Sequence, residues 1–142
     1  KADIHIYNEP PKNVSADMIG PAHPESNIRA IKLHIPDNES ANHKRYREMR
    51  QEAHQWNHLF WAKHNRTFFQ QKEEYVKMKL AEKKQKYGPD ADQTLTPEEL
   101  SEFYQRFLNE NYSAHKQYNR SIFYSTFCFI NLITDMFILQ FI

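Results

Sequence analysis

Hydrophobic side chains recur at helical spacing through the first half of the chain. Between Ala41 and about His64, the large apolar residues are separated alternately by three and four positions, which places them on one face of a helix. The preceding segment, Pro36–Ser40, contains Asp, Asn and Ser, which are residues that cap the start of a helix. The pattern predicts a helix whose buried face consists of Tyr46, Met49, Ala53, Trp56 and Phe60.

The spacing leaves open where this helix ends. Asn65–Gln70 offers a stop, and Thr67 with Gln70 has the spacing of a capping box, so a second helix is expected to begin there. The break is favoured because the next apolar stripe lies about half a turn from the first. A single continuous helix is the alternative. The second stripe consists of Phe69, Val76 and Leu80.

The clearest local signal marks the start of a later helix. After a loop at Tyr87–Gln93, Thr96 is followed by a proline and by Glu99, which combines a capping box with proline in the first turn. This helix is predicted to reach Tyr112 and to continue past Tyr118. Its wide apolar stripe consists of Leu100, Phe103, Tyr104, Phe107 and Leu108.

Residues 1–40 differ in character and hold most of the prolines. Ile31, Leu33 and Ile35 alternate with polar residues, as in a strand, but no second strand is recognisable as a partner. The chain has only two glycines, too few for a β protein with many tight turns. The predicted fold class is therefore all-α, with three to four helices and an extended, proline-rich N-terminal segment laid across them.

Charge and composition exclude several function classes. The 19 basic residues nearly balance the 18 acidic ones, so nucleic acid is not an expected partner. Cys128 is the only cysteine, which excludes a disulfide framework within one chain. The chain has no glycine-rich phosphate loop and no nucleophile-elbow motif. These observations predict that the protein is not an enzyme and binds no cofactor.

The two tryptophans are predicted to have different roles. Trp56 belongs to the apolar stripe and is expected in the core. Trp61 lies about 100° around the helix, in line with a basic row, which suits a partner protein or an anionic membrane surface. Burial of Trp61 under the N-terminal segment or a later helix is the alternative. The predicted docking residues are His43, Arg47, Arg50, His54 and Trp61.

Two further patterns have competing interpretations. His54 and His58 have the spacing of metal ligands on a helix, but two imidazoles do not make a site, so no metal is predicted and solvated histidines are preferred. Five Asn-x-Ser/Thr sequons would suit a secreted glycoprotein if the chain entered the secretory pathway. They begin at Asn13, Asn38, Asn65, Asn111 and Asn119.

The last residues, 121–142, form an apolar tail. Asp135 is the only charged residue between Ile122 and Ile142, and this length would span a bilayer. Asn131, Thr134, Asp135 and Gln140 weaken that interpretation, and no basic cluster flanks the C-terminal end. The bias toward Phe, Ile, Leu, Asn and Thr is also typical of translated AT-rich non-coding DNA, which would make the tail foreign to the protein.

Several motifs together resemble the animal apoptogenic-protein family, also described as a mitochondrial cytochrome c oxidase assembly factor. The resemblance covers about residues 19–120. In the N-terminal part it rests on Ile19-Gly-Pro21, Pro24-Glu-Ser-Asn27 and Ile35-Pro-Asp-Asn-Glu-Ser40. In the helical part it rests on Trp56-Asn57, Phe60-Trp-Ala62, Lys72-Glu-Glu74, Phe103-Tyr104, Phe107-Leu108 and Tyr118-Asn-Arg120.

The resemblance implies a non-enzymatic protein, imported by a cleaved transit peptide and held peripherally on the matrix side of the mitochondrial inner membrane. It also implies a role in building complex IV, with oxidase subunits or assembly intermediates as partners, and a link to apoptosis. Family members continue after Arg120 with an aromatic and strongly basic helix, so a retained intron or a wrong exon at Arg120 would explain the apolar tail. The expected organisation is an extended segment at 1–40, a helical domain at 41–120 and the tail at 121–142.

Two alternatives to an assembly factor stay open from the residues alone. The sequons and the apolar tail would suit a secreted or membrane-anchored helical glycoprotein. The histidines around Trp61 would suit a small metal- or haem-handling protein.

Overall fold

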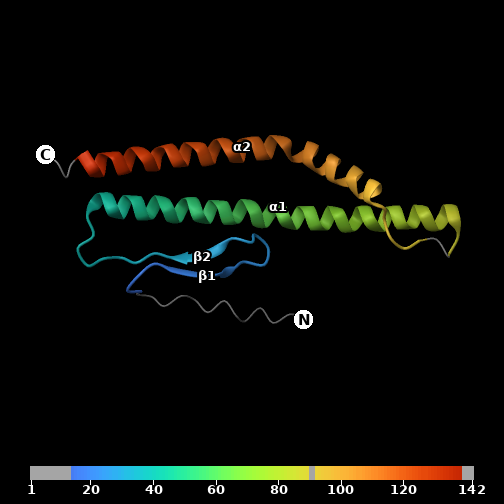
Figure 1. The fold of residues 1–142 in the computed structure, drawn as a ribbon, viewed down its shortest axis with the longest axis horizontal. Helices are drawn as coiled ribbons and strands as arrows, with labels where there is room; N and C mark the ends of the chain where they lie inside the picture. Colours follow the sequence, from blue (N-terminus) through green and yellow to red (C-terminus); the bar gives the residue numbers. More distant parts are fainter. Residues whose placement is uncertain (1–13, 90–91, 139–142) are drawn as a thin grey trace.

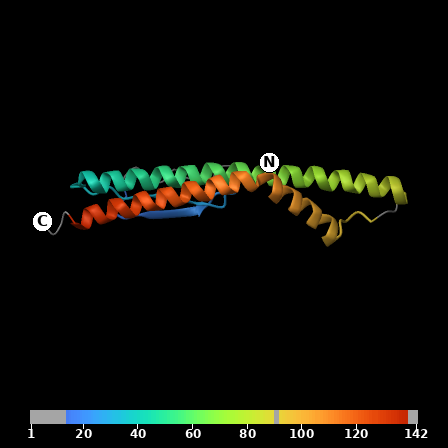
Figure 2. The same ribbon diagram turned by 90° about the horizontal axis from the view of Figure 1, so that it is seen from above.

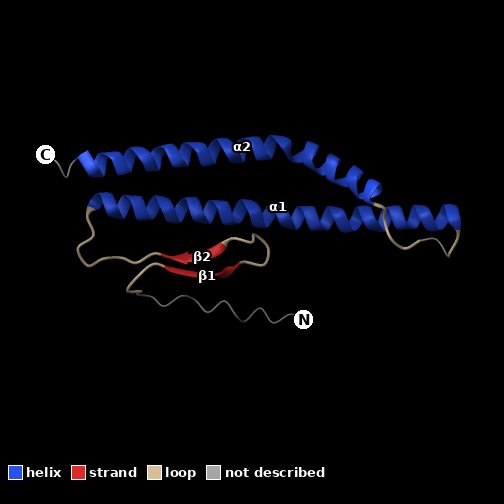
Figure 3. Cartoon of the chain, viewed as in Figure 1, coloured by secondary structure: helices blue, strands red, loops and turns tan. Residues whose placement is uncertain are grey.

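The computed structural model describes residues 14–89 and 92–138. Two long helices dominate it: α1 (Ala41–Tyr87) and α2 (Pro97–Ile138). They run antiparallel, and a small hairpin of β1 (Met18–Ala22) and β2 (Arg29–Lys32) lies along the first half of α1 (Figures 1 and 3). The hairpin and α2 contact different sides of α1, so α1 is the central element of the fold.

The predicted break after His64 is wrong, because α1 is one helix of 47 residues. The segment contains neither proline nor glycine, the two residues that most readily interrupt a helix. Asn65 does not cap a new helix. Its side-chain amide instead donates to the carbonyl oxygen of Glu25 at 2.7 Å. The structure therefore has two helices in its described part where the sequence predicted three to four.

The predicted starts of the helices after Ser40 and at Thr96, and the predicted loop after α1, are confirmed. Ser40 caps α1 by accepting a hydrogen bond from the His43 amide. Gly88 ends α1 with a φ of 90°, a backbone conformation that favours glycine. At the start of α2, the Glu99 amide donates to the Thr96 hydroxyl and the Glu99 carboxylate accepts from the Thr96 amide, which is a complete capping box.

The apolar segment after Arg120 continues α2 without interruption. Leu132 is buried, and the ring of Phe129 packs edge-on against Tyr46 near the start of α1. Figure 2 shows that the first turns of α2 run obliquely to α1, whereas the remainder runs alongside it. Within residues 14–89 and 92–138, no helix is long and apolar enough to cross a membrane.

The all-α prediction is also wrong in one respect, because the N-terminal segment forms a hairpin. β1 pairs antiparallel with β2, with Met18 opposite Lys32 and Ile19 opposite Ile31. The pairing becomes irregular between Ile19 and Ala22, where Gly20 and Pro21 stand. Proline lacks an amide hydrogen and is tolerated in edge strands. Gly20 and Pro21 interrupt the alternation of apolar and polar residues, so the sequence pattern did not predict this strand.

The buried core lies where the first turns of α2 meet α1. Its centre consists of Tyr75 from α1 with Phe103 and Phe107 from α2, and Phe68 and Leu95 pack around it. The hydroxyl of Tyr75 donates to the Glu99 carbonyl oxygen at 2.9 Å, so its polar atom is satisfied inside the core. Because this core is small, each of its rings carries a large share of the stability.

We expect Phe103→Ala to destabilise the fold by about 3–5 kcal/mol, because Phe103 is 0% exposed and its removal leaves a cavity. Leu108→Ala is the matched control on the same helix. Leu108 is 60% exposed, so the loss should be roughly 0.5 kcal/mol or less. Denaturant unfolding followed by circular dichroism measures both, and equal losses would contradict this placement of the core.

Candidate functional site

The basic row predicted from the sequence faces the N-terminal segment. Arg47 donates from Nε and Nη2 to the two carboxylate oxygens of Glu39, both at 2.8 Å. The side chains are only 14% and 11% exposed. These paired bonds lower the pKa of the Glu39 carboxyl and raise that of Arg47. A two-bond, largely shielded ion pair is stronger than an ordinary surface pair.

The other members of the row also contact this segment. Arg50 lies 3.3 Å from an oxygen of Asp17, and both side chains are about half exposed. The Nε2 atom of His54 is 2.8 Å from the Arg29 carbonyl oxygen. His43 Nδ1 lies 2.8 Å from the Ser40 hydroxyl. An open cavity of about 470 Å³ lies between the row and residues 33–40, and His43, Arg47 and Arg50 line it.

The hairpin turn is attached to the next turns of α1 by further polar contacts. The buried hydroxyl of Ser26 lies 2.8 Å from His58 Nδ1, and Glu25 pairs with Arg66 at 2.6 Å. Burial, and then the positive charge of the nearby His23, lower the pKa of His58. His54 and His58 therefore bind the hairpin, and the preference for solvated histidines is wrong. Among the described residues, no three metal-ligating side chains converge.

Trp61 faces away from the basic row and toward α2. Its Nε1 atom donates to the Tyr118 hydroxyl at 2.9 Å, and that hydroxyl donates to Asn57 Oδ1 at 2.6 Å. The ring of Phe60 stacks on Tyr118 with centroids 4.3 Å apart. This chain of hydrogen bonds joins residues about sixty positions apart, so no spacing in the sequence could have revealed it.

The burial of the two tryptophans is the reverse of the prediction, because Trp61 is more covered than Trp56. Trp56 is 39% exposed and lies flat on Tyr118, with centroids 5.2 Å apart. Trp61 is half-buried and its indole nitrogen has a partner, as is usual for a buried tryptophan. The prediction from helical spacing was wrong because α2 covers the side of α1 that carries Trp61. The apolar stripe of α1 did not indicate where α2 would pack.

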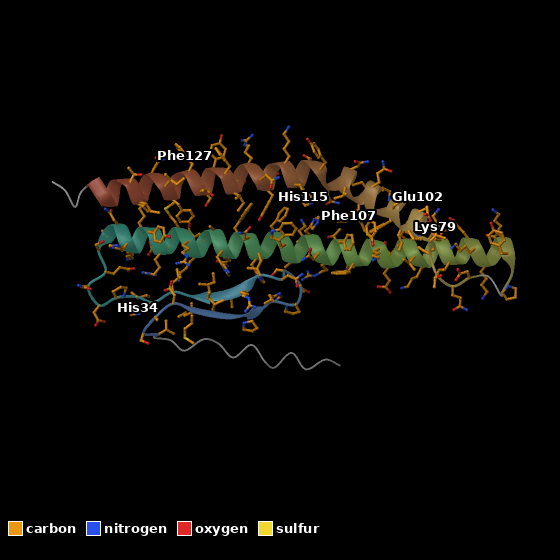
Figure 4. The ribbon with its side chains drawn as sticks, viewed as in Figure 1. His34, Lys79, Glu102, Phe107, His115 and Phe127 are labelled. Carbon is orange, nitrogen blue, oxygen red and sulfur yellow. The ribbon has the colours of Figure 1, made fainter. Side chains whose placement is uncertain are left out.

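Two histidines complete what we call the aromatic cluster: Trp56, Phe60, Trp61 and His64 of α1 with Phe107, His115 and Tyr118 of α2 (Figure 4). The rings of His64 and His115 meet edge to face, 4.6 Å apart. Burial and the neighbouring His115 lower the pKa of His64. The buried Nε2 of His115 has no hydrogen-bond partner within the described structure. Burial of His64 against α2 therefore disfavours its protonated form.

Several of the motifs that carry the family resemblance lie at these two surfaces of α1. Trp56, Phe60, Trp61 and Tyr118 belong to the aromatic cluster, and Asn57 accepts a hydrogen bond from Tyr118. Glu25-Ser26 and Glu39-Ser40 hold the N-terminal segment against α1. A family model described as "Cytochrome c oxidase assembly factor 8" matches residues 16–142. The chain belongs to this family. The resemblance is thereby confirmed, and the match extends past Arg120.

Individual relatives agree with the cytochrome c oxidase assembly factor 8 family. The protein of that name from Mus musculus is 42% identical over 113 residues, covering 78% of this chain and 59% of its own. The Homo sapiens protein is 40% identical over 113 residues, with coverages of 78% and 55%. A COA8 family protein of Caenorhabditis briggsae, named as mitochondrial, is 44% identical over 104 residues, covering 73% of this chain and 69% of its own.

This member of the cytochrome c oxidase assembly factor 8 family spans less than two thirds of the length of its mammalian relatives. No solved structure matches it. Two of the sequon asparagines are engaged in the fold, since Asn65 and Asn111 donate their side-chain amides to backbone carbonyl oxygens. Asn13 lies outside the described residues. The intron origin of residues 121–142 stays a prediction.

Replacing the two tryptophans tests the reversed assignment. We expect Trp61→Ala to cost about 2–3 kcal/mol, because it removes a half-buried ring and its hydrogen bond. Trp56→Ala should cost less, roughly 1–2 kcal/mol, because much of this ring is already in water. Trp61→Phe separates the two effects by removing only the indole N–H, at about 1 kcal/mol. A larger loss for Trp56→Ala in chemical unfolding would contradict the structure.

The pH dependence of stability tests the lowered pKa values of His58 and His64. A histidine whose folded pKa is lowered binds a proton more weakly than in the unfolded chain, so stability falls as pH drops below about 6.5. His64 and His58 both act in this direction. We expect the free energy of unfolding to decrease from about pH 7 to pH 5, above the range in which carboxylates titrate. His64→Phe should flatten this slope, and an unchanged slope would contradict the lowered pKa of His64.

Proposed function

We propose that this protein is a non-enzymatic assembly factor for cytochrome c oxidase, acting at the matrix face of the mitochondrial inner membrane. The observation that carries the proposal is family membership: relatives that match 78% of this chain are named cytochrome c oxidase assembly factor 8. Related proteins from nematodes and a fly are named as mitochondrial. The role in apoptosis implied by the resemblance stays a prediction.

The shape of the molecule supports a binding role. Two long helices contact each other along one side, and large apolar residues of both helices are exposed, including Phe69 and Met78 of α1 and Tyr112 and Phe123 of α2. Exposed apolar surface of this extent is typical of proteins that bind other macromolecules. An assembly factor holds unfinished subunits, and an elongated surface allows several contacts at once.

The predicted docking residues acquire a more specific interpretation under this proposal. His43, Arg47, Arg50 and His54 contact the N-terminal segment. A partner that binds this row must therefore compete with Asp17 and Glu39 for the guanidinium groups. Trp61 acts differently, since it orders the interface of α1 with α2. We propose that its contribution to docking is indirect, through the exposed face of Trp56 beside it.

A complementation experiment tests the function. The chain is expressed behind a cleavable mitochondrial leader in cells that lack their own family member, and assembled complex IV is measured on native gels. We expect complex IV to recover. Phe103→Ala, which damages the core, should recover less, and Leu108→Ala should behave as the unchanged chain. Correct import and folding without any gain in complex IV would contradict the proposal.

The same cells distinguish the secreted-glycoprotein alternative. The natural full-length transcript is expressed without an added leader, and the product is treated with a glycosidase that removes N-linked sugars. We expect no change in mass and co-fractionation with mitochondria. A mass shift on treatment would favour the secretory pathway over the proposal.

A further inference from the structure

The outer side of α2 carries an apolar surface that the proposed function does not yet explain. Six residues spaced by four, four, three, four and three positions share one face of the helix. We call them the outer stripe: Tyr112, Lys116, Arg120, Phe123, Phe127 and Ile130. The tyrosine is 67% exposed, the two phenylalanines 70% and 56%, and the isoleucine 56%.

The rest of the described fold leaves the outer stripe uncovered. The opposite side of α2 packs on α1, where Tyr118 meets Trp61, Phe129 meets Tyr46 and Leu132 is buried. Figure 4 shows Phe127 on the side of α2 that points away from α1. The hairpin lies on the other side of α1 (Figure 1).

The charges around the stripe are of one sign. No Asp or Glu occurs between Glu110 and Asp135, while Lys116 and Arg120 lie on the stripe itself. The Arg120 guanidinium lies 5.9 Å from the centre of the exposed Tyr124 ring. Cations and aromatic residues bordering an apolar face are typical of helices that lie on anionic bilayers.

We propose that the outer stripe of α2 binds the surface of an anionic lipid bilayer, with the helix parallel to the membrane. This inference rests on the proposed function, and it names the surface that would hold the protein at the membrane. The helix lies on the bilayer because its other face is occupied by α1. Phe123, Phe127 and Ile130 enter the headgroup boundary, and Lys116 and Arg120 bind lipid phosphates.

The same charges argue against a second copy of this chain as the occupant. Pairing two outer stripes would bring four cations into one interface without a carboxylate to neutralise them. Burial of unpaired charge is unfavourable. An anionic lipid surface instead supplies the missing negative charge.

Sedimentation of the purified full chain with vesicles tests the inference. Two compositions are used: phosphatidylcholine alone, and phosphatidylcholine mixed with phosphatidylglycerol. We expect binding mainly to the mixed vesicles. Lys116→Gln with Arg120→Gln should weaken that binding about 25-fold, because each basic residue near an anionic surface strengthens partition about fivefold. Phe123→Glu with Phe127→Glu should weaken it by about tenfold or more.

Leu59→Glu is the matched control, because Leu59 is 59% exposed on α1 and lies outside the stripe. Circular dichroism verifies that every variant is folded. Absence of binding, equal binding to neutral vesicles, or an equal loss with Leu59→Glu would overturn the inference. So would a dimer in analytical ultracentrifugation that Phe123→Glu with Phe127→Glu abolishes while vesicle binding is absent. Vesicle binding without rescue of complex IV would refute the proposed function alone.

Discussion

The contact between the aromatic faces of α1 and α2 is the interaction on which the rest of the structure depends. A helix of 47 residues gains most of its stability from packing, since intrinsic helix propensity is a weak contribution. Here that packing comes from a few large rings, with Phe103 and Phe107 at one end and Tyr118 in the middle. The hydrogen bond from Trp61 to Tyr118 fixes the register of the two helices.

The hairpin depends on this helix pair in turn. A lone two-stranded hairpin is at best marginally stable in water, and the strands here are short. Buried Leu33 contributes one apolar anchor, and the remaining attachment is polar, through Glu39, Asp17 and Ser26. Exposed ion pairs are individually weak, so the shielded contact between Glu39 and Arg47 is the strongest of these attachments. A rigid α1 is needed to present all these partners at once.

The two faces of α1 bind different parts of the protein. One face secures α2 and so positions the exposed surfaces of both helices, including the outer stripe. The other face holds the N-terminal segment over the basic row. A protein built this way presents a long surface for contacts. That division is consistent with the assembly-factor role that we propose.

Local rules in the sequence determined the start of both helices and the end of α1, because the caps at Ser40 and Thr96 and the glycine after Tyr87 act within a few residues. They also determined the apolar stripe with Phe103 and Phe107. The motifs were specific enough to indicate the family.

Tertiary structure decided the rest. The position of α2 determines which tryptophan is covered, and the pairing of Ile19 with Ile31 makes a strand of a segment with glycine and proline. Arg47 and Arg50, which were predicted to bind a partner, instead pair with Glu39 and Asp17 of the N-terminal segment. Asp17 lies 33 positions from Arg50. Burial and charge pairing depend on which distant segments meet, and periodicity within one helix carries no information about that.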